Sequence, residues 1–232
     1  MVHGLFDLLA LIAALGVGNW FRDRHGLARP VGIHDQDQQR YYLVSLLLGL
    51  ALGSLAFGTW NLWLSGGDGL AKSILGGIFG AVVAAELFKR LNGIQESTGL
   101  YFVPGLLVLI ALGRIGCFFG GVEDFTYGVA TTLPWGVDFG DGVLRHPVQL
   151  YESLTMTLFL VFFLIDYTRR PLVWSQQGFY WFVLVYSMQR FVWETIKPYP
   201  ALFFGLNLFH WLCLALAAYA LWMLKFGVTD GE

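Results

Sequence analysis

Residues 99–118 read GLYFVPGLLVLIALGRIGCF, and Arg114 is the only charged side chain in this stretch. A transmembrane helix needs about 20 consecutive, mainly apolar residues. Similar apolar runs lie at about 4–21, 42–64, 73–88, 148–166, 178–196 and 201–224. The runs are long and lack the alternation of β-barrel strands, which indicates helices. We therefore predict an all-α integral membrane protein with about seven transmembrane helices.

The composition supports a protein whose solvent is the lipid bilayer. Of the 232 residues, 56% are apolar and 13% are charged, and the mean hydropathy is +0.62. Soluble domains carry about 25% charged residues, so an ordinary cytosolic enzyme and a disordered chain are excluded. The net charge of −2 leaves no general basic patch for nucleic acid. We expect one transmembrane domain over residues 1–232, with membrane lipids as partners.

The positions of lysine and arginine predict the orientation in the membrane. Threading seven helices puts one group of basic residues on the same side, namely Arg22, Arg24, Arg29, Arg40, Lys89, Arg90, Arg169, Arg170 and Lys225. The other side receives Lys72, Arg145 and Lys197. Cytoplasmic connections carry the excess of basic residues. The N-terminus is therefore expected outside and the C-terminus in the cytoplasm.

The longest connection on the outer side runs from about residue 119 to 147 and is rich in glycine. Turns are expected around Gly140 and Gly142. Loops of this length are usually functional or mobile. We expect this segment to form a cap at the level of the outer lipid headgroups.

The same threading gathers ionisable residues in the outer leaflet. Arg114 and Arg190 lie inside apolar runs, and Glu194 shares a helix face with Arg190. Glu152 lies in about the first turn of the fifth helix, and His146 lies at the entrance of that helix. Ionisable residues inside a membrane are costly and usually functional. Because guanidinium groups bind phosphate in a bidentate manner, the two arginines suit a phosphodiester. These five residues are the candidate catalytic set.

Each of these residues also has a structural interpretation. Arg190 and Glu194 could form an ion pair that locks two helices, and Arg114 could extend to the membrane interface. His146 could be an ordinary loop residue, and Glu152 could cap a helix. The cysteines show no spacing typical of a disulfide framework or a zinc site. No metal and no organic cofactor are predicted.

Four motifs in order resemble those of the bacterial prolipoprotein diacylglyceryl transferase family. GRIGCF (113–118) resembles the family's GRxGNFxN signature, and HPVQLYE (146–152) resembles its HPxQLYE motif. RFVWE (190–194) is similar to its late RxxxE helix motif, and SILGGI (73–78) to its SxHGGL segment. The resemblance extends from about residue 70 to 215. The family's seven helices and its orientation agree with the threading.

The resemblance implies a multi-pass enzyme of the bacterial inner membrane that moves the diacylglyceryl group of phosphatidylglycerol to the lipobox cysteine of a prolipoprotein signal peptide. Arg114 and Arg190 would hold the phosphate, Glu152 and Glu194 would orient the arginines or the headgroup, and His146 would accept a proton. The residues expected to bind substrate are Gly113, Gly116, Gln149, Tyr151, Glu123, Gly76 and Gly77.

The sequence departs from the family pattern in the half that activates the acceptor. Leu75 stands where the family motif has a histidine, and Cys117 and Gly120 replace its two asparagines. Glu123 is the candidate replacement for a family glutamate. The alternative function is a phosphatidylglycerol-dependent transferase with another acceptor, such as a small molecule or glycan, or one that moves phosphoglycerol. A lipid or solute carrier is the third possibility.

Overall fold

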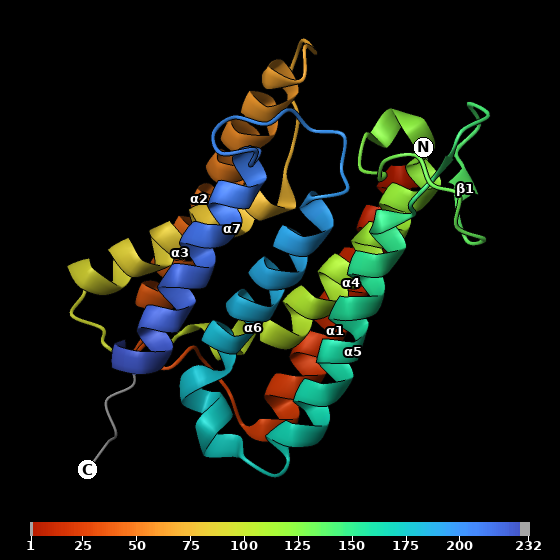
Figure 1. Ribbon diagram of the computed structural model, residues 1–232. Coiled ribbons are helices and arrows are strands. Elements are labelled where there is room, and N and C mark those ends of the chain that lie inside the picture. The colour runs from red at the N-terminus through yellow and green to blue at the C-terminus, as the bar shows by residue number, and fades with distance from the viewer. Residues whose placement is uncertain (1, 228–232) are drawn as a thin grey trace.

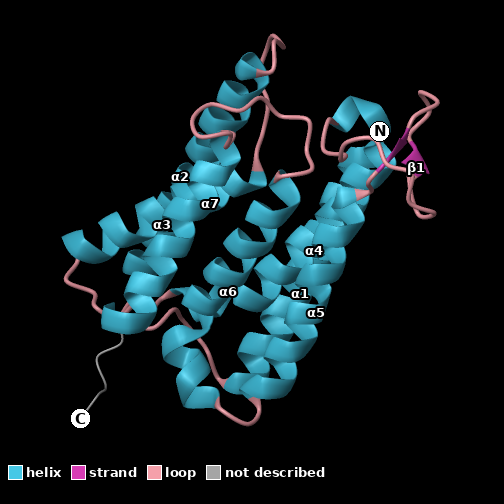
Figure 2. Ribbon diagram, in the orientation of Figure 1, coloured by secondary structure: helices cyan, strands magenta, loops and turns pink. Residues whose placement is uncertain are grey.

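The computed structural model describes residues 2–227. These residues form seven α-helices (Figures 1 and 2): α1 (Val2–His25), α2 (Gln36–Leu64), α3 (Ile74–Leu91), α4 (Val103–Gly120), α5 (Val148–Tyr167), α6 (Pro171–Glu194) and α7 (Leu208–Trp222). The 3₁₀ helices η1 (Gly99–Phe102) and η2 (Gly121–Asp124) flank α4, and a π-helical turn, η3 (Met223–Gly227), extends α7. Strands β1 (Val137–Asp138) and β2 (Leu144–Arg145) form a short antiparallel hairpin.

The predicted all-α class is confirmed, and the chain is a multi-pass membrane protein. Within residues 2–227, five helical segments can cross a membrane by length and composition: Gly4–His25, Gln36–Leu64, Gly99–Asp124, Val148–Tyr167 and Leu208–Gly227. Helices α3 and α6 are not among these segments. Glu86, Lys89 and Arg90 lie in the last turns of α3, and α6 contains the ionisable pair Arg190 and Glu194.

Two predicted helix boundaries are wrong by about seven residues. The sixth helix begins at Pro171 rather than 178, because proline fits the first turn of a helix and the polar residues that follow extend the helix beyond the apolar run. The last helix begins at Leu208 rather than 201. Residues before it form a loop in which Phe204 has a positive φ of 54°. Asn207 then caps α7 by accepting from the backbone of His210 at 3.0 Å.

The helices form two groups that α6 connects. Figure 1 shows α1, α4 and α5 together on one side and α2, α3 and α7 on the other, with α6 between them. Helix α4 packs against both α1 and α5, and α6 packs against α7. The apolar core includes Leu107, Phe163, Phe182 and Tyr186, all fully buried or nearly so. The first residues of α1, the 121–147 segment and the α6–α7 connection lie at the same end of the bundle.

Glycines bring α2 and α3 into backbone contact. A Cβ atom at Gly53 would collide with the backbone of Gly76 and Gly80, and one at Gly80 would collide with Gly49. Gly77 faces Leu50 of α2. Close backbone approach through small residues is the usual means of helix association in membranes.

The segment expected as a loop cap is folded. Because α4 continues to Gly120, the segment begins at residue 121 rather than 119. Asp138 Oδ1 accepts hydrogen bonds from the backbone of Gly140 and Gly142, which confirms the predicted turns. The backbone N–H of Val129 donates to Ile196 at 2.7 Å, so the segment is attached to the α6–α7 connection.

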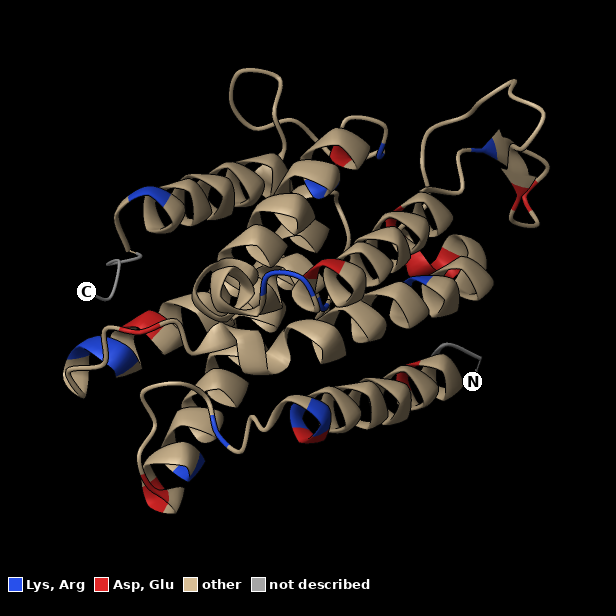
Figure 3. Ribbon diagram, turned by 90° about the horizontal axis from the view of Figure 1, so that it is seen from below, with Lys and Arg blue, Asp and Glu red and all other residues tan. Residues whose placement is uncertain are grey.

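Charged residues gather at the helix ends and in the connections (Figure 3). The long middle parts of the helices are almost free of charge in this view. A group of ionised side chains that several helices bury together is the exception, and it forms the candidate site.

Candidate active site

Glu152 is the centre of the buried charged group. It lies in the second turn of α5, and its side chain is fully buried. Its Oε2 atom is 2.6 Å from Nε of Arg114 on α4. Its Oε1 atom accepts from Nη1 of Arg190 on α6 and from Nζ of Lys197 at 2.8 Å. One carboxylate therefore binds three cations from three parts of the chain.

Glu194 is the second carboxylate of the group. Its Oε2 atom lies 3.1 Å from Nε of Arg190, so Arg190 bridges the two glutamates. The amide of Asn207 donates to Glu194 Oε1 at 3.5 Å. The guanidinium carbon of Arg190 also lies 5.8 Å from the ring centre of Phe209. Helix α6 and the start of α7 are thus joined around Glu194.

The charges of the group do not balance. Arg114, Arg190 and Lys197 contribute three positive charges, and Glu152 and Glu194 contribute two negative ones. Each of these side chains is at most 5% exposed. Because charges buried away from water are costly unless they are paired, the surplus positive charge is suited to pairing with an anion.

Polar side chains without partners surround the ion pairs. Gln149, one turn before Glu152, is fully buried, and neither atom of its amide has a hydrogen-bond partner among the described residues. The hydroxyl of Tyr186, one turn before Arg190, is also buried and has no hydrogen-bond partner among the described residues. Buried polar groups nearly always have partners. These two groups are suited to hydrogen bonding with a polar ligand.

Gly113 provides room beside Arg114. The residue is buried, yet a Cβ atom built on it would meet no atom of another residue's side chain or of another segment within 4 Å. Gly116, one turn along the helix, is also buried. The free volume lies at the same level of α4 as the buried charges.

His146 and Tyr151 lie where the outer segment meets the start of α5. His146 is half-buried, and its Nδ1 atom is 3.4 Å from the hydroxyl of Tyr151. Trp135 donates to the same hydroxyl at 2.8 Å, and Trp193 packs against the Tyr151 ring at 5.0 Å between centres. The backbone of His146 is bonded to Val129. The structure thus connects His146 to the outer segment and to Tyr151.

The other predicted site residues lie elsewhere. Glu123 is exposed on η2 and makes no ion pair among the described residues. Gly76 and Gly77 face α2. Leu75 is fully buried in the apolar core. The structure therefore brings together Arg114, Arg190, Glu152 and Glu194, with Gln149 and Gly113 close to them in the chain.

The structure also decides between interpretations of two residues. The alternative in which Arg114 extends to the membrane interface is wrong, because its guanidinium is buried on Glu152. Arg190 and Glu194 do form an ion pair, and this pair belongs to the larger group.

Lys197 and Asn207 are the site residues that sequence reasoning missed. In the sequence, Lys197 counts only as one of the basic residues of the outer side, although it lies one turn beyond Glu194 and is bounded by Ile196 and Pro198. A lysine between apolar neighbours was the available signal. Asn207 gave none, because it lies inside a run expected to be helical.

The fold and the site define a multi-pass helical membrane protein with a buried, positively charged site. The chain belongs to the prolipoprotein diacylglyceryl transferase family, whose model matches residues 2–226.

Named relatives agree with this membership. The chain is 32% identical to the phosphatidylglycerol–prolipoprotein diacylglyceryl transferase of Nitratidesulfovibrio vulgaris strain DP4, over 99% of this chain and 90% of that protein. It is 31% identical to the enzyme of that name from Geobacter sulfurreducens, over 84% of this chain and 76% of that protein. The identity to the Aliarcobacter butzleri enzyme is 27%, over 92% and 82%. No solved structure matches the chain significantly.

Proposed function

We propose that this protein transfers the diacylglyceryl group of phosphatidylglycerol to the lipobox cysteine thiol of prolipoproteins. The family and the printed names of its relatives support this activity. The observation that carries the proposal is the buried group in which Arg114, Arg190 and Lys197 outnumber Glu152 and Glu194 by one charge. The phosphodiester of phosphatidylglycerol bears one negative charge, which restores the balance.

The arginines are suited to hold the phosphate. A guanidinium has five N–H donors in a fixed fork. Arg114 uses Nε on Glu152 and donates from Nη1 to Sγ of Cys117 at 3.9 Å, whereas Arg190 uses Nε and Nη1 on the two glutamates. The Nη2 donors of both guanidinium groups therefore remain for phosphate oxygens. In this role Glu152 and Glu194 are positioning residues that fix the two forks.

The proposed reaction makes one bond and breaks one. The acceptor sulfur attacks the diacylglyceryl carbon that carries the phosphate oxygen. The S–C bond forms as the C–O bond breaks, and the bonding electrons leave with that oxygen. The thiol proton passes to a base, for which His146 is our candidate, and glycerol 1-phosphate leaves. Negative charge grows on the phosphate in this step, where preorganised cations are most effective.

The remaining predicted residues would complete the binding of the lipid. The unpartnered amide of Gln149 suits a hydroxyl of the glycerol headgroup. Gly113 and Gly116 would let the lipid approach α4 closely, and Tyr151 would orient His146. For Glu123, Gly76 and Gly77 the proposed binding role has no support from their positions.

A second candidate function keeps the donor and changes the acceptor. Leu75 replaces the histidine of the family motif, and its side chain is part of the apolar core. An apolar residue cannot accept the thiol proton. In this alternative the acceptor either needs no such base or receives another group from the lipid.

We propose seven membrane spans in a single domain of the bacterial inner membrane, with the N-terminus outside and the C-terminus in the cytoplasm. The positions of the connections support this arrangement. The end of α1, which carries Arg22 and Arg24, and the end of α3, which carries Lys89 and Arg90, lie away from the end of the bundle that holds the 121–147 segment. Reporter fusions at Lys225 and within 138–142 test the orientation. A reporter at Lys225 that is active only outside the cytoplasm would contradict it.

The transfer itself is tested in two assays. The first is growth of a strain depleted of its own prolipoprotein diacylglyceryl transferase. The second uses purified protein in nanodiscs with acyl-labelled phosphatidylglycerol and a lipobox peptide. We expect a thioether-linked lipid on the peptide cysteine, and no product with Arg190→Ala. Use of the phosphatidylglycerol without peptide modification would instead favour the second candidate function.

A further inference from the structure

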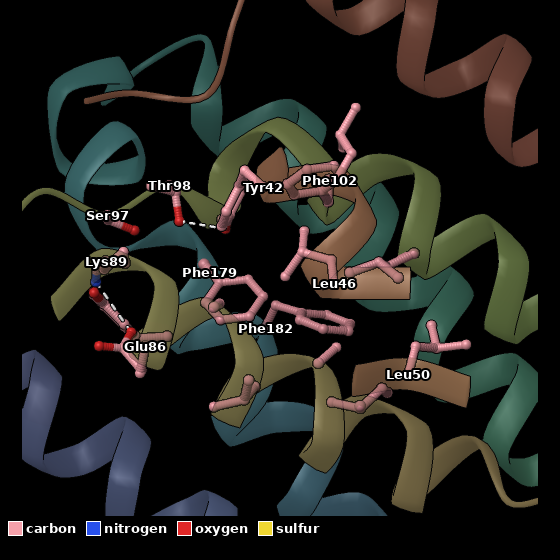
Figure 4. A pocket seen from close by; sticks show the side chains of 18 of the residues that line it. Tyr42, Leu46, Leu50, Glu86, Lys89, Ser97, Thr98, Phe102, Phe179 and Phe182 are labelled. Atoms are coloured by element: carbon pink, nitrogen blue, oxygen red, sulfur yellow. Dashed lines mark hydrogen bonds and ion pairs between the residues drawn. The ribbon is translucent and has the colours of Figure 1, made fainter. Parts of the chain in front are cut away.

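A cavity of about 280 Å³ lies apart from the charged site. Its walls come from α2, α3, α6 and the region around η1 (Figure 4). Leu46, Leu50, Phe102 and Phe182 illustrate the lining, which is almost wholly apolar. Such a lining inside a membrane protein is suited to a hydrocarbon chain rather than to a polar substrate.

The cavity runs along the helices for about the depth of one leaflet. On α3 its lining extends from Ile78 to Lys89, which is roughly 16 Å at 1.5 Å per residue. The hydrocarbon core of a bilayer is about 30 Å thick. On α2 the lining includes Leu47 and Leu50, which are also exposed on the outer surface of the helix bundle. A lipid chain can therefore enter sideways from the bilayer.

One end of the cavity is polar and carries both signs of charge. Lys89 Nζ donates to Glu86 Oε1 at 3.0 Å, and the hydroxyl of Tyr219 donates to the same oxygen at 2.7 Å. Thr98 and Tyr42 share a hydrogen bond of 2.6 Å at this end. The polar groups lie toward the end of α3 that carries its basic residues. They mark the level of a lipid headgroup.

We propose that this cavity binds one glycerophospholipid with a zwitterionic headgroup, from the leaflet on the Lys89 side. An acyl chain fills the apolar length, the lipid ammonium faces Glu86, and the lipid phosphate faces Lys89. An ammonium of lysine has three N–H donors, and Glu86 accepts from one of them. The neutral pair matches a headgroup that carries both charges and disfavours an anionic lipid.

The geometry distinguishes this lipid from the donor lipid of the charged site. Phe182 is the cavity residue on α6 closest in sequence to Arg190. Eight residues, or roughly 12 Å, separate the two along the helix. The polar end of the cavity lies still further away. A donor held by Arg190 would place its chain ends, not its headgroup, toward Glu86 and Lys89.

Photolabelling tests the site. The full protein is placed in nanodiscs with phosphatidylethanolamine that carries a diazirine in its acyl chain, and the labelled residues are mapped by mass spectrometry. We expect label on Ile78, Val82 and Phe102. Label confined to outward-facing residues, such as Val44 and Leu48, would overturn the proposal. So would stronger labelling of the lining by phosphatidylglycerol with the same diazirine, because that result would assign the cavity to donor chains.

Matched variants on α2 test the cavity itself. Leu46→Trp fills it and should lower labelling of Val82 about tenfold, the change that ~1.4 kcal/mol of lost binding produces. Leu48→Trp adds the same side chain on the exposed face and should leave the labelling unchanged. The smaller change Ala81→Leu, on α3, should act like Leu46→Trp. Equal labelling of Val82 in all three variants would overturn the proposal.

Discussion

Glu152 and Lys197 lie 2.8 Å apart in the interior of the protein, although 45 residues separate them in the chain. Lys197 follows α6, so this ion pair attaches the α6–α7 connection to α5. The same carboxylate also pairs with Arg114 and Arg190. Arg114 and Lys197 thus depend on Glu152 for charge compensation, whereas Arg190 is compensated by both Glu152 and Glu194.

Glu152→Gln should both destabilise and inactivate the protein. The amide keeps the shape of the side chain but removes the negative charge, which leaves Glu194 alone with three buried cations. Breaking a buried pair by removing one partner costs about 3–5 kcal/mol. We expect a lower thermal unfolding midpoint in detergent and no transfer of labelled lipid in nanodiscs.

Glu123→Gln is the matched control, because Glu123 is exposed and makes no ion pair among the described residues. It should keep the unfolding midpoint. An unchanged midpoint for Glu152→Gln as well would show that the buried charges do not depend on Glu152.

Deprotonation of Lys197 should weaken the binding of the lipid at alkaline pH. Burial and the nearby positive charge of Arg190 lower the pKa of Lys197 from 10.5 to about 8, against the opposing effect of Glu152. Above that pH the folded protein loses the charge that favours an anion. The affinity for phosphatidylglycerol, measured by titration in nanodiscs, should therefore fall as the pH rises through about 8.

The same shift has the opposite sign for stability. Between about pH 8 and 10.5 the unfolded chain binds more protons at Lys197 than the folded protein does, so this residue's contribution to the free energy of unfolding rises with pH. Lys197→Arg keeps its charge at every pH in this range. If Lys197→Arg retains the alkaline loss of affinity, another group is responsible.

Arg114→Lys and Arg190→Lys should each reduce turnover strongly while the protein remains folded. Lysine keeps one positive charge but lacks the fork that can hold Glu152 and a phosphate together. Removing one preorganised donor to a developing negative charge costs about 10²–10³ in kcat. Single-turnover rates in nanodiscs measure the loss, and Arg169→Lys, at the end of α5, is the control. Full turnover for both variants would exclude a role on the phosphate.

The sequence predicted the helical class and much of the site because both follow from local signals. An apolar run that contains Arg114 or Arg190 marks a costly burial, and the spacing of Arg190 and Glu194 places them on one helix face. The boundaries of α6 and α7 could not be predicted in this way. They depend on Pro171, on the backbone of Phe204 and on the cap at Asn207, which hydropathy does not detect.

The role of Glu152 as the shared partner of three cations could not be predicted either. Its three partners come from α4, α6 and the connection after α6, and only the packed helices bring them together. Threading the helices through a membrane places Lys197 on the outer side, because a single sequence does not show which loops fold inward. The cavity near Glu86 is likewise a product of helix packing.

Gly113→Ala should weaken the binding of phosphatidylglycerol without lowering the stability of the fold. The structure has room for the added methyl group, so the unfolding midpoint should change little. If the lipid uses this volume, the KM for phosphatidylglycerol should rise more than kcat falls. Gly53→Ala is the contrasting variant, because its methyl group would collide with the α3 backbone and lower stability. An unchanged KM for Gly113→Ala would place the lipid elsewhere.

His146→Gln tests the candidate base. General-base assistance is worth about 10²–10⁴-fold, so turnover should fall by that range if His146 accepts the thiol proton. Wild-type activity should also decrease in acid, because an imidazolium cannot accept a proton. The acid limb of the pH–rate profile should disappear in His146→Gln, and the rate that remains should follow ionisation of the acceptor thiol.

Tyr151→Phe is the control that tests whether the side chain of His146 has only a structural role. Its hydroxyl lies 3.4 Å from Nδ1 of His146 and accepts from Trp135. Removing it leaves the imidazole in place but loosens its orientation, so turnover should fall modestly and the acid limb should remain. The backbone bonds that attach residue 146 to Val129 do not depend on its side chain. If His146→Gln keeps full turnover and an unchanged acid limb, His146 only anchors the outer segment, and the base must be sought among the buried groups around Lys197.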